Sequence, residues 1–165
     1  MKYKIVKIEK LSGTEASIYT LLQDGETKTL FDSFLSENNN LFKSEIIDIV
    51  KRLRAIGQKT GAREQFFKLN EGNPGDGVSA LYDRRNAILR LYCIRYANIA
   101  IILGSGGEKP KSIKSFQDSP KLKKENYLLR RASKEILERI KNKDFKWSPD
   151  SSDLIGNLEI EIDEE

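Results

Sequence analysis

Two neighbouring stretches, 89–96 and 99–103, constrain the fold more than any other part of the sequence, because both are rich in β-branched, aromatic and aliphatic residues. Only Ala97 and Asn98 separate them. Asn98 tolerates a positive φ, so the pattern predicts a β-hairpin with a two-residue turn. The second stretch is apolar at every position, which is typical of a strand buried on both faces. We therefore expect this hairpin to form the centre of the fold.

Side chains along 89–96 alternate between the two faces of the predicted sheet. One face receives Leu89, Leu91, Cys93 and Arg95, and the other receives Arg90, Tyr92, Ile94 and Tyr96. Arg90 thus lies in or beside a buried sheet, where an unpaired guanidinium is costly. The residues leave two interpretations open: the guanidinium binds an external anion, or it pairs with a carboxylate or reaches solvent at the edge of the sheet.

Charge is distributed unevenly along the chain. Residues 150–165 carry seven acidic side chains and no basic one, so residues 1–149 carry 29 basic against 18 acidic side chains, a net charge of +11. A body this basic attracts polyanions, of which nucleic acid is the most abundant. The acidic tail, 150–165, either folds back on the body or stays solvated and flexible, and we favour the solvated form.

Missing residue types exclude several kinds of chemistry. The chain has no histidine, which excludes Ser-His-Asp catalysis and the commonest zinc sites. Its one cysteine, Cys93, lies in a predicted strand and is interpreted as a small buried hydrophobe in a reducing compartment. We find no membrane span and no signal peptide. We therefore expect a cytoplasmic protein that uses no metal and no cofactor.

The remaining patterns predict an α+β fold in a single domain, 1–149. Strands are expected at 2–9, 16–22, 65–68 and 78–82, and helices at 30–35, 41–56 and, after the Ser119-Pro120 start signal, 120–140. The first two strands should pair as an N-terminal hairpin within 1–28. The later strands, joined by short turns, should form an antiparallel meander packed against the two preceding helices and the C-terminal helix.

A glycine-rich segment, 104–107, follows the central hairpin and resembles a phosphate-binding loop only superficially. Such a loop ends in Gly-Lys-Ser/Thr or opens directly into a helix, whereas residues 108–111 here read EKPK. We interpret the segment as a flexible strand exit at which two backbones approach closely.

Three short motifs resemble the RelE/ParE/HigB superfamily of small bacterial toxins, most closely its phage-derived, HigB-like branch. Residues 89–92 (LRLY) resemble a strand with an arginine beside an apolar-aromatic pair. Residues 108–111 (EKPK) resemble a lysine-rich strand end, and Arg63 in ARE resembles an arginine at the entry to the sheet. The resemblance covers 41–140. The N-terminal hairpin, 1–28, and the acidic tail are additions, and Pro110 interrupts the lysine segment.

The resemblance implies a RelE-like fold and the toxin role in a type II toxin-antitoxin system. Such a toxin is an mRNA endoribonuclease, often ribosome-dependent, that promotes attack of a ribose 2′-hydroxyl on the adjacent phosphate. The catalytic candidates are Arg63, Arg90, Tyr92, Lys109 and Lys111. The arginines would hold the phosphate, a lysine would supply charge or act as base, and the tyrosine would stack a base or donate a proton. The RNA-binding candidates are Lys114, Arg95, Lys121, Lys124, Arg130 and Arg131.

Expected partners are a cognate antitoxin protein, mRNA and the ribosome, with no membrane. Two alternatives use the same fold: a catalytically inactive module that binds RNA or the ribosome, and a ParE-like gyrase inhibitor. A role in protein interaction alone, with the acidic tail as the contact, is a further alternative.

Overall fold

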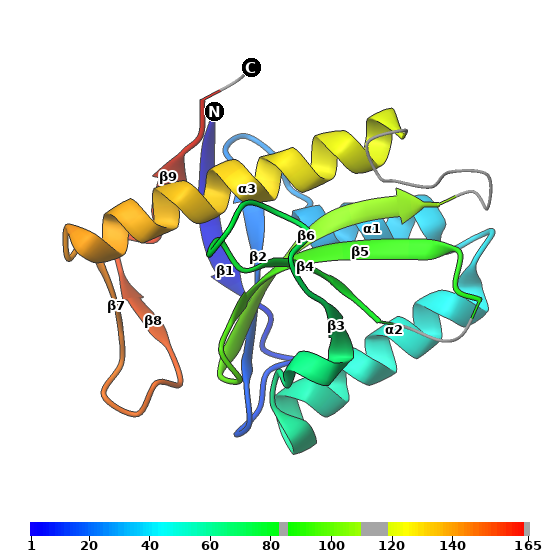
Figure 1. The fold of residues 1–165 in the computed structure, drawn as a ribbon, viewed down its shortest axis with the longest axis horizontal. Coiled ribbons are helices and arrows are strands. Elements are labelled where there is room, and N and C mark those ends of the chain that lie inside the picture. Colours follow the sequence, from blue (N-terminus) through cyan, green and yellow to red (C-terminus); the bar gives the residue numbers. More distant parts are fainter. Residues whose placement is uncertain (83–85, 110–118, 164–165) are drawn as a thin grey trace.

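The computed structural model describes residues 1–82, 86–109 and 119–163 (Figure 1). The elements in chain order are β1 (Lys2–Lys7), β2 (Ser17–Gln23), α1 (Leu30–Asn38), α2 (Lys43–Ala55), the π-helical turn η1 (Ile56–Thr60), the 3-10 turn η2 (Glu64–Phe66), β3 (Phe67–Lys68), β4 (Val78–Leu81), β5 (Leu89–Tyr96), β6 (Ala100–Glu108), α3 (Pro120–Lys141), β7 (Phe145–Trp147), β8 (Leu154–Gly156) and β9 (Glu159–Glu161). The predicted α+β class is confirmed.

Seven strands form one mixed sheet in the order β3-β4-β5-β6-β2-β1-β9. The predicted meander is present, because β3, β4, β5 and β6 pair antiparallel in sequence. The predicted N-terminal hairpin is also present, with Ile5 opposite Leu21. The two parts join in a contact that the sequence did not predict: β2 lies parallel to β6, with Ser17 opposite Ala100, so the sheet is mixed. The hairpin is therefore built into the sheet beside its central strand, where it extends the buried surface.

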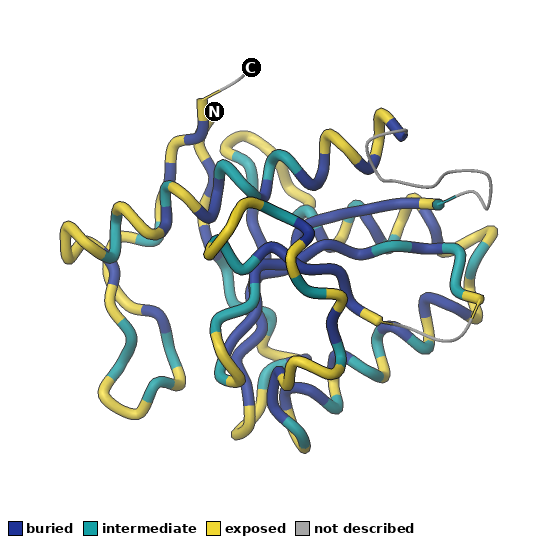
Figure 2. Tube along the Cα trace, viewed as in Figure 1, coloured by how far each residue is buried: buried dark blue, intermediate teal, exposed yellow. Residues whose placement is uncertain are grey.

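Helices cover both faces of the sheet (Figure 1). On one face α1 and α2 pack against Leu89, Leu91 and Cys93 of β5. On the other face α3 packs against Tyr92 and Ile94, so the predicted alternation along β5 is confirmed. Figure 2 shows the central strands buried along most of their length, as expected for a sheet covered on both sides.

Local signals explain where two of these helices begin. Thr29 caps α1 by accepting a hydrogen bond from the Asp32 amide, and the Asp32 carboxylate accepts one from the Thr29 amide in return. The Ser119-Pro120 start predicted for α3 is confirmed, because the Ser119 hydroxyl accepts a hydrogen bond from the Leu122 amide at 3.3 Å. These caps satisfy backbone donors that a helix start leaves unpaired.

The connection between β5 and β6 differs from the predicted two-residue turn. Tyr96 pairs with Ala100, so three residues connect the strands, and Ala97, not Asn98, has the positive φ, of 48°. Asn98 is held by two contacts: its carbonyl accepts from the Ala62 amide at 2.8 Å and its side chain accepts from Arg95 at 2.8 Å. These tertiary contacts fix a turn that local propensity alone did not indicate.

The glycine-rich segment 104–107 lies inside β6 and is buried, so its interpretation as a flexible strand exit was wrong. The expected close approach is confirmed. A side chain on Gly106 would overlap the Arg90 carbonyl of β5, and a Cβ on Gly104 would lie 2.7 Å from Leu129 of α3. The glycines therefore let β6 lie directly against β5 and α3.

The expectation of a solvated acidic tail is not met by the described residues up to 163. β8 pairs with β7, and β9 pairs with β1 at the edge of the main sheet. Ile160 and Ile162 are buried, whereas Glu159 and Glu161 lie opposite Lys4 and Lys2. The alternation of acidic and aliphatic residues therefore suits a strand with one buried face and one charged face.

None of the helices within the described residues combines the length and the apolar character that crossing a bilayer requires.

Candidate functional site

A hollow of about 200 Å³ lies between β3, the end of β4, the start of β5 and the end of β6. Three cationic side chains, Lys68, Arg90 and Lys109, line it, and no acidic side chain does so among the described residues. The Lys109 amide donates to the Ile88 carbonyl at 2.8 Å, which holds the end of β6 beside the start of β5. The fold thus gathers positive charge from three strands at one place.

Glu71 supplies a carboxylate to this cluster from the loop before β4. Its Oε1 lies 3.4 Å from Nη1 of Arg90 and 3.5 Å from Nζ of Lys68. The Arg90 side chain, which is 14% exposed, thus pairs with a carboxylate, and this ion pair confirms one of the two interpretations that the sequence left open. Among the described residues, two cations share one carboxylate oxygen and a third cation lines the same hollow, so positive charge is in excess there. The remaining charge is what an added anion would neutralise.

The ammonium group of Lys109 is less stable here than in water. Burial is the main cause that lowers its pKa, and the positive charges of Arg90 and Lys68 lower it further, while Glu71 opposes them. The cationic neighbours therefore act in the direction expected for a lysine that gives up its proton more readily than usual. A neutral amine in this hollow could accept a proton from a bound hydroxyl.

Three side chains of α3 fix the loop that carries Glu71. The fully buried Asn126 donates to the Glu71 carbonyl at 2.9 Å, and Arg130 donates to the same oxygen at 3.0 Å. Arg130 also donates to the Asn126 side-chain oxygen at 2.7 Å, and Ser133 donates to the Asp76 carbonyl at 2.6 Å. The helix thereby sets where the Glu71 carboxylate meets Arg90.

Tyr92 lies beside the cluster but has no exposed surface. Burial raises the pKa of its hydroxyl to about 12, although Arg90 lowers it. A fully buried ring offers no face to a nucleobase. Its position therefore fits packing against α3 and support of Arg90 better than direct contact with a substrate.

Arg63 and Arg95 lie at the opposite end of β5 from Arg90. At a rise of about 3.3 Å per residue, Arg95 is roughly 16 Å along the strand from Arg90. Arg95 donates to the Ala62 carbonyl at 2.7 Å, and the exposed Arg63 donates to the Thr60 carbonyl at 3.0 Å. The structure therefore does not bring Arg63 to the cationic hollow, and it commits Arg95 to holding a turn.

The basic residues predicted on α3 do not form one continuous face. Arg130 lies on the flank that contacts Glu71, whereas Lys124 and Arg131 line a different hollow with Met1 and Asp163. Consecutive helical residues are about 100° apart, so Arg130 and Arg131 necessarily point in different directions. The α3 residues predicted to bind RNA therefore lie on different sides of the helix.

The remaining predicted cations are Lys111, Lys114 and Lys121. Lys121 lies 3.4 Å from Glu37 of α1 and 3.3 Å from Glu125, so its charge is shared within the protein. Lys111 and Lys114 fall outside the described residues.

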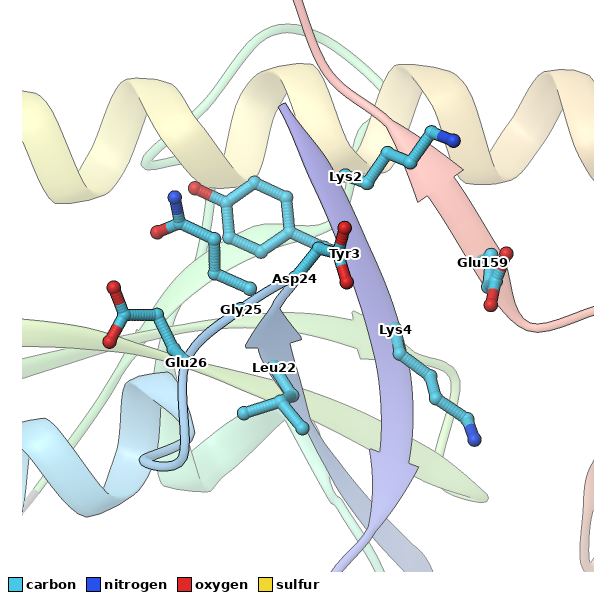
Figure 3. A pocket seen from close by; sticks show the side chains of 9 residues that line it. Lys2, Tyr3, Lys4, Leu22, Asp24, Gly25, Glu26 and Glu159 are labelled. Atoms are coloured by element: carbon cyan, nitrogen blue, oxygen red, sulfur yellow. The ribbon is translucent and has the colours of Figure 1, made fainter.

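A second hollow, of about 390 Å³, lies near the opposite edge of the sheet, between β1, β9 and the loop after β2 (Figure 3). Its lining contains Lys2 and Lys4 together with Asp24, Glu26 and Glu159. Charges of both signs are therefore present, which gives it no preference for an anion. No cluster of three or more cysteine, aspartate or glutamate side chains fit to hold a metal is found in the part of the chain that the structure describes.

The sequence interpretation missed Lys68, Glu71 and Asn126. Lys68 lies in a strand of two residues, too short to show alternation, and Glu71 lies in a loop. No sequence period connects Glu71 with Arg90 or with Asn126 on a helix far along the chain. Among these residues only the charge of Lys68 within an expected strand, 65–68, could have drawn attention to it.

Comparisons with protein-family models, with curated proteins and with solved structures give no match to this chain.

Proposed function

We propose that this chain binds RNA at the hollow formed by Lys68, Arg90 and Lys109 and cleaves it as a toxin-type endoribonuclease of the RelE-like kind. The observation that carries the proposal is the excess of positive charge in that hollow, where Glu71 is shared by two of three cations. A guanidinium can bind two phosphate oxygens at once, and the two ammonium groups add charge from either side. The chain as a whole has a net charge of +4, even with its acidic tail folded onto the sheet, and this charge favours a polyanion.

The proposed reaction needs no group beyond those of the hollow, the RNA and water. The neutral amine of Lys109 accepts the proton of a ribose 2′-hydroxyl, whose oxygen forms a bond to the adjacent phosphorus. Arg90 and Lys68 stabilise the charge that develops on the phosphorane. The bond to the 5′-oxygen then breaks, that oxygen takes a proton from water or from the Lys109 ammonium, and a 2′,3′-cyclic phosphate and a 5′-hydroxyl result. Glu71 keeps Arg90 oriented.

The test is induced expression of the full chain, with transcript ends mapped and RNA binding measured on purified protein. We expect growth arrest and new transcript ends with the unchanged chain, and neither with Arg90→Ala or Lys109→Met. Arg90→Ala should also weaken RNA binding about tenfold and reduce its dependence on salt. The matched control is Arg54→Ala, because Arg54 is an exposed arginine of α2 that lies outside the hollow. Equal effects of Arg54→Ala and Arg90→Ala would refute the site.

A second candidate function is RNA binding without cleavage. Two observations favour it: the Tyr92 hydroxyl is buried, and Arg63 lies at the far end of β5. Protein that binds RNA with steep salt dependence and leaves transcripts intact, even on translating ribosomes, would establish this second function in place of the first.

A further inference from the structure

Tyr82 is an exposed aromatic residue at the cationic hollow. It follows β4 directly, lines the same hollow as Lys68, Arg90 and Lys109, and is 51% exposed. Its amide donates to the Phe66 carbonyl at 2.8 Å, so the backbone that carries the ring is anchored beside β3. The backbone of Tyr82 is therefore held beside the hollow, and its side chain is open to solvent.

Tyr92 lies beside the hollow but is enclosed by the protein, with no exposed surface. Its ring offers no face to a ligand, so the stacking role predicted for Tyr92 cannot be filled there. Tyr82 has the accessible ring that such a role requires.

An isolated exposed aromatic residue on a protein surface needs no explanation. The combination found here is more specific, because one ring and three cations line a single hollow. Single-stranded nucleic acids are bound by this pairing: basic side chains hold the phosphate, and an aromatic ring stacks on the neighbouring base. A base within a duplex is already stacked on both sides, so a duplex gains nothing from the ring.

We propose that Tyr82 is a base-stacking platform and that the hollow binds one nucleotide of single-stranded RNA. The phosphate lies against Arg90 and its neighbouring lysines, and the adjoining base lies on the Tyr82 ring. This inference rests on the proposed RNA-binding function and adds the substrate class, single-stranded RNA, and one contact residue.

The test uses the full chain and a 2′-O-methyl RNA oligonucleotide that contains 2-aminopurine, so that binding is measured without cleavage and stacking quenches the fluorescence. We expect Tyr82→Leu to weaken binding about tenfold and to abolish the quenching. Tyr82→Phe keeps the ring and should bind like the unchanged protein. Neither change should alter the slope of log affinity against log salt, because that slope counts phosphate contacts. Arg90→Ala should reduce the slope.

Two outcomes would overturn the inference, and they can be told apart. If Arg90→Ala weakens binding while Tyr82→Leu binds and quenches like the unchanged protein, the phosphate site stands and the stacking platform is wrong. If the unchanged protein binds no RNA, both the proposed function and the stacking platform are wrong. Equal affinity for a duplex of the same sequence would also contradict the assignment to single strands.

Discussion

Positive charge is balanced differently in the two halves of the main sheet, the half formed by β3, β4 and β5 and the half formed by β2, β1 and β9. In the β1 half, each of the three lysines of β1 has an acidic counterpart. Lys2 lies opposite Glu161, Lys4 lies opposite Glu159, and Nζ of Lys7 lies 2.6 Å from a carboxylate oxygen of Asp153. In the β3–β5 half, two cations, Lys68 and Arg90, share the carboxylate of Glu71, and a third, Lys109, lines the same hollow. Within the described residues, the basic side chains of β1 are therefore matched one to one by acidic ones, whereas the cations of the hollow outnumber the nearby carboxylate. A basic composition alone does not locate a binding site; the local balance does.

Loss of apolar contact in the β1 half of the sheet should have the largest effect on the free energy of unfolding. Ile160 is 1% exposed and joins the core cluster under α3. Ile160→Ala should lower the free energy of unfolding by about 3 kcal/mol, because it removes buried methyl groups and leaves a cavity. Urea denaturation measures this. The control is Ile155→Ala, since Ile155 of β8 is 38% exposed and should change stability far less. Similar losses for both changes would contradict the packing of β9.

One lysine in each half of the sheet, Lys7 and Lys109, should differ in pKa. The hydrogen bond to Asp153 raises the pKa of Lys7 above 10.5, whereas burial and then Arg90 lower the pKa of Lys109 below 10.5. NMR of lysines labelled at Cε should therefore show Lys109 losing its proton at a lower pH than Lys7. Asp153→Asn should lower the pKa of Lys7, and Arg90→Gln should raise that of Lys109.

These shifts have opposite consequences for stability. The stabilisation from Lys7 is fully present below pH 10.5 and is lost as pH rises through its folded-state pKa. For Lys109 the unfavourable charge is present at low pH and disappears as pH rises from its folded-state pKa toward 10.5, so its contribution becomes more favourable. A pKa of Lys109 equal to or higher than that of Lys7 would contradict the charge balance described for the two halves of the sheet.

The smallest effect should come from the exposed charges between β1 and β9. Glu159→Lys places a like charge opposite Lys4 and should cost about 0.5 kcal/mol of unfolding free energy. Adding Lys4→Glu restores an opposite pair and should recover most of that loss. A double-mutant cycle in low salt measures the coupling, and a coupling that does not weaken in high salt would not be electrostatic.

Local patterns predicted most of the elements because each depends on neighbours in sequence. Period-two alternation identified both faces of β5, and the Ser119-Pro120 signal identified the start of α3. The parallel pairing of β2 with β6 left no such signal, because it is decided by packing between segments far apart in the chain. The prediction of a solvated tail was wrong because it rested on the acidic charge of the tail alone. It did not consider that Glu159, Ile160 and Glu161 alternate as in a strand with one buried face.

The candidate site was predictable only where it lies on a patterned strand. Arg90 was found from its place in β5, and Lys109 from its motif. Glu71 and Asn126 come from a loop and a helix, and only the folded chain shows that Asn126 holds the Glu71 carbonyl while the Glu71 carboxylate meets Arg90. Arg63 was wrongly grouped with Arg90, because proximity to the sheet in sequence does not tell which end of a strand a loop reaches.

The parallel contact between β2 and β6 also bears on the order of folding. The β5–β6 hairpin needs only local contacts and can form early, whereas β1 pairs with β9 across almost the whole chain, Tyr3 with Ile160. During synthesis the β1–β2 hairpin leaves the ribosome long before either neighbouring strand exists. Both of its edges then stay open to other chains, so we expect misassembly to compete with folding until β6 and β9 pair with it.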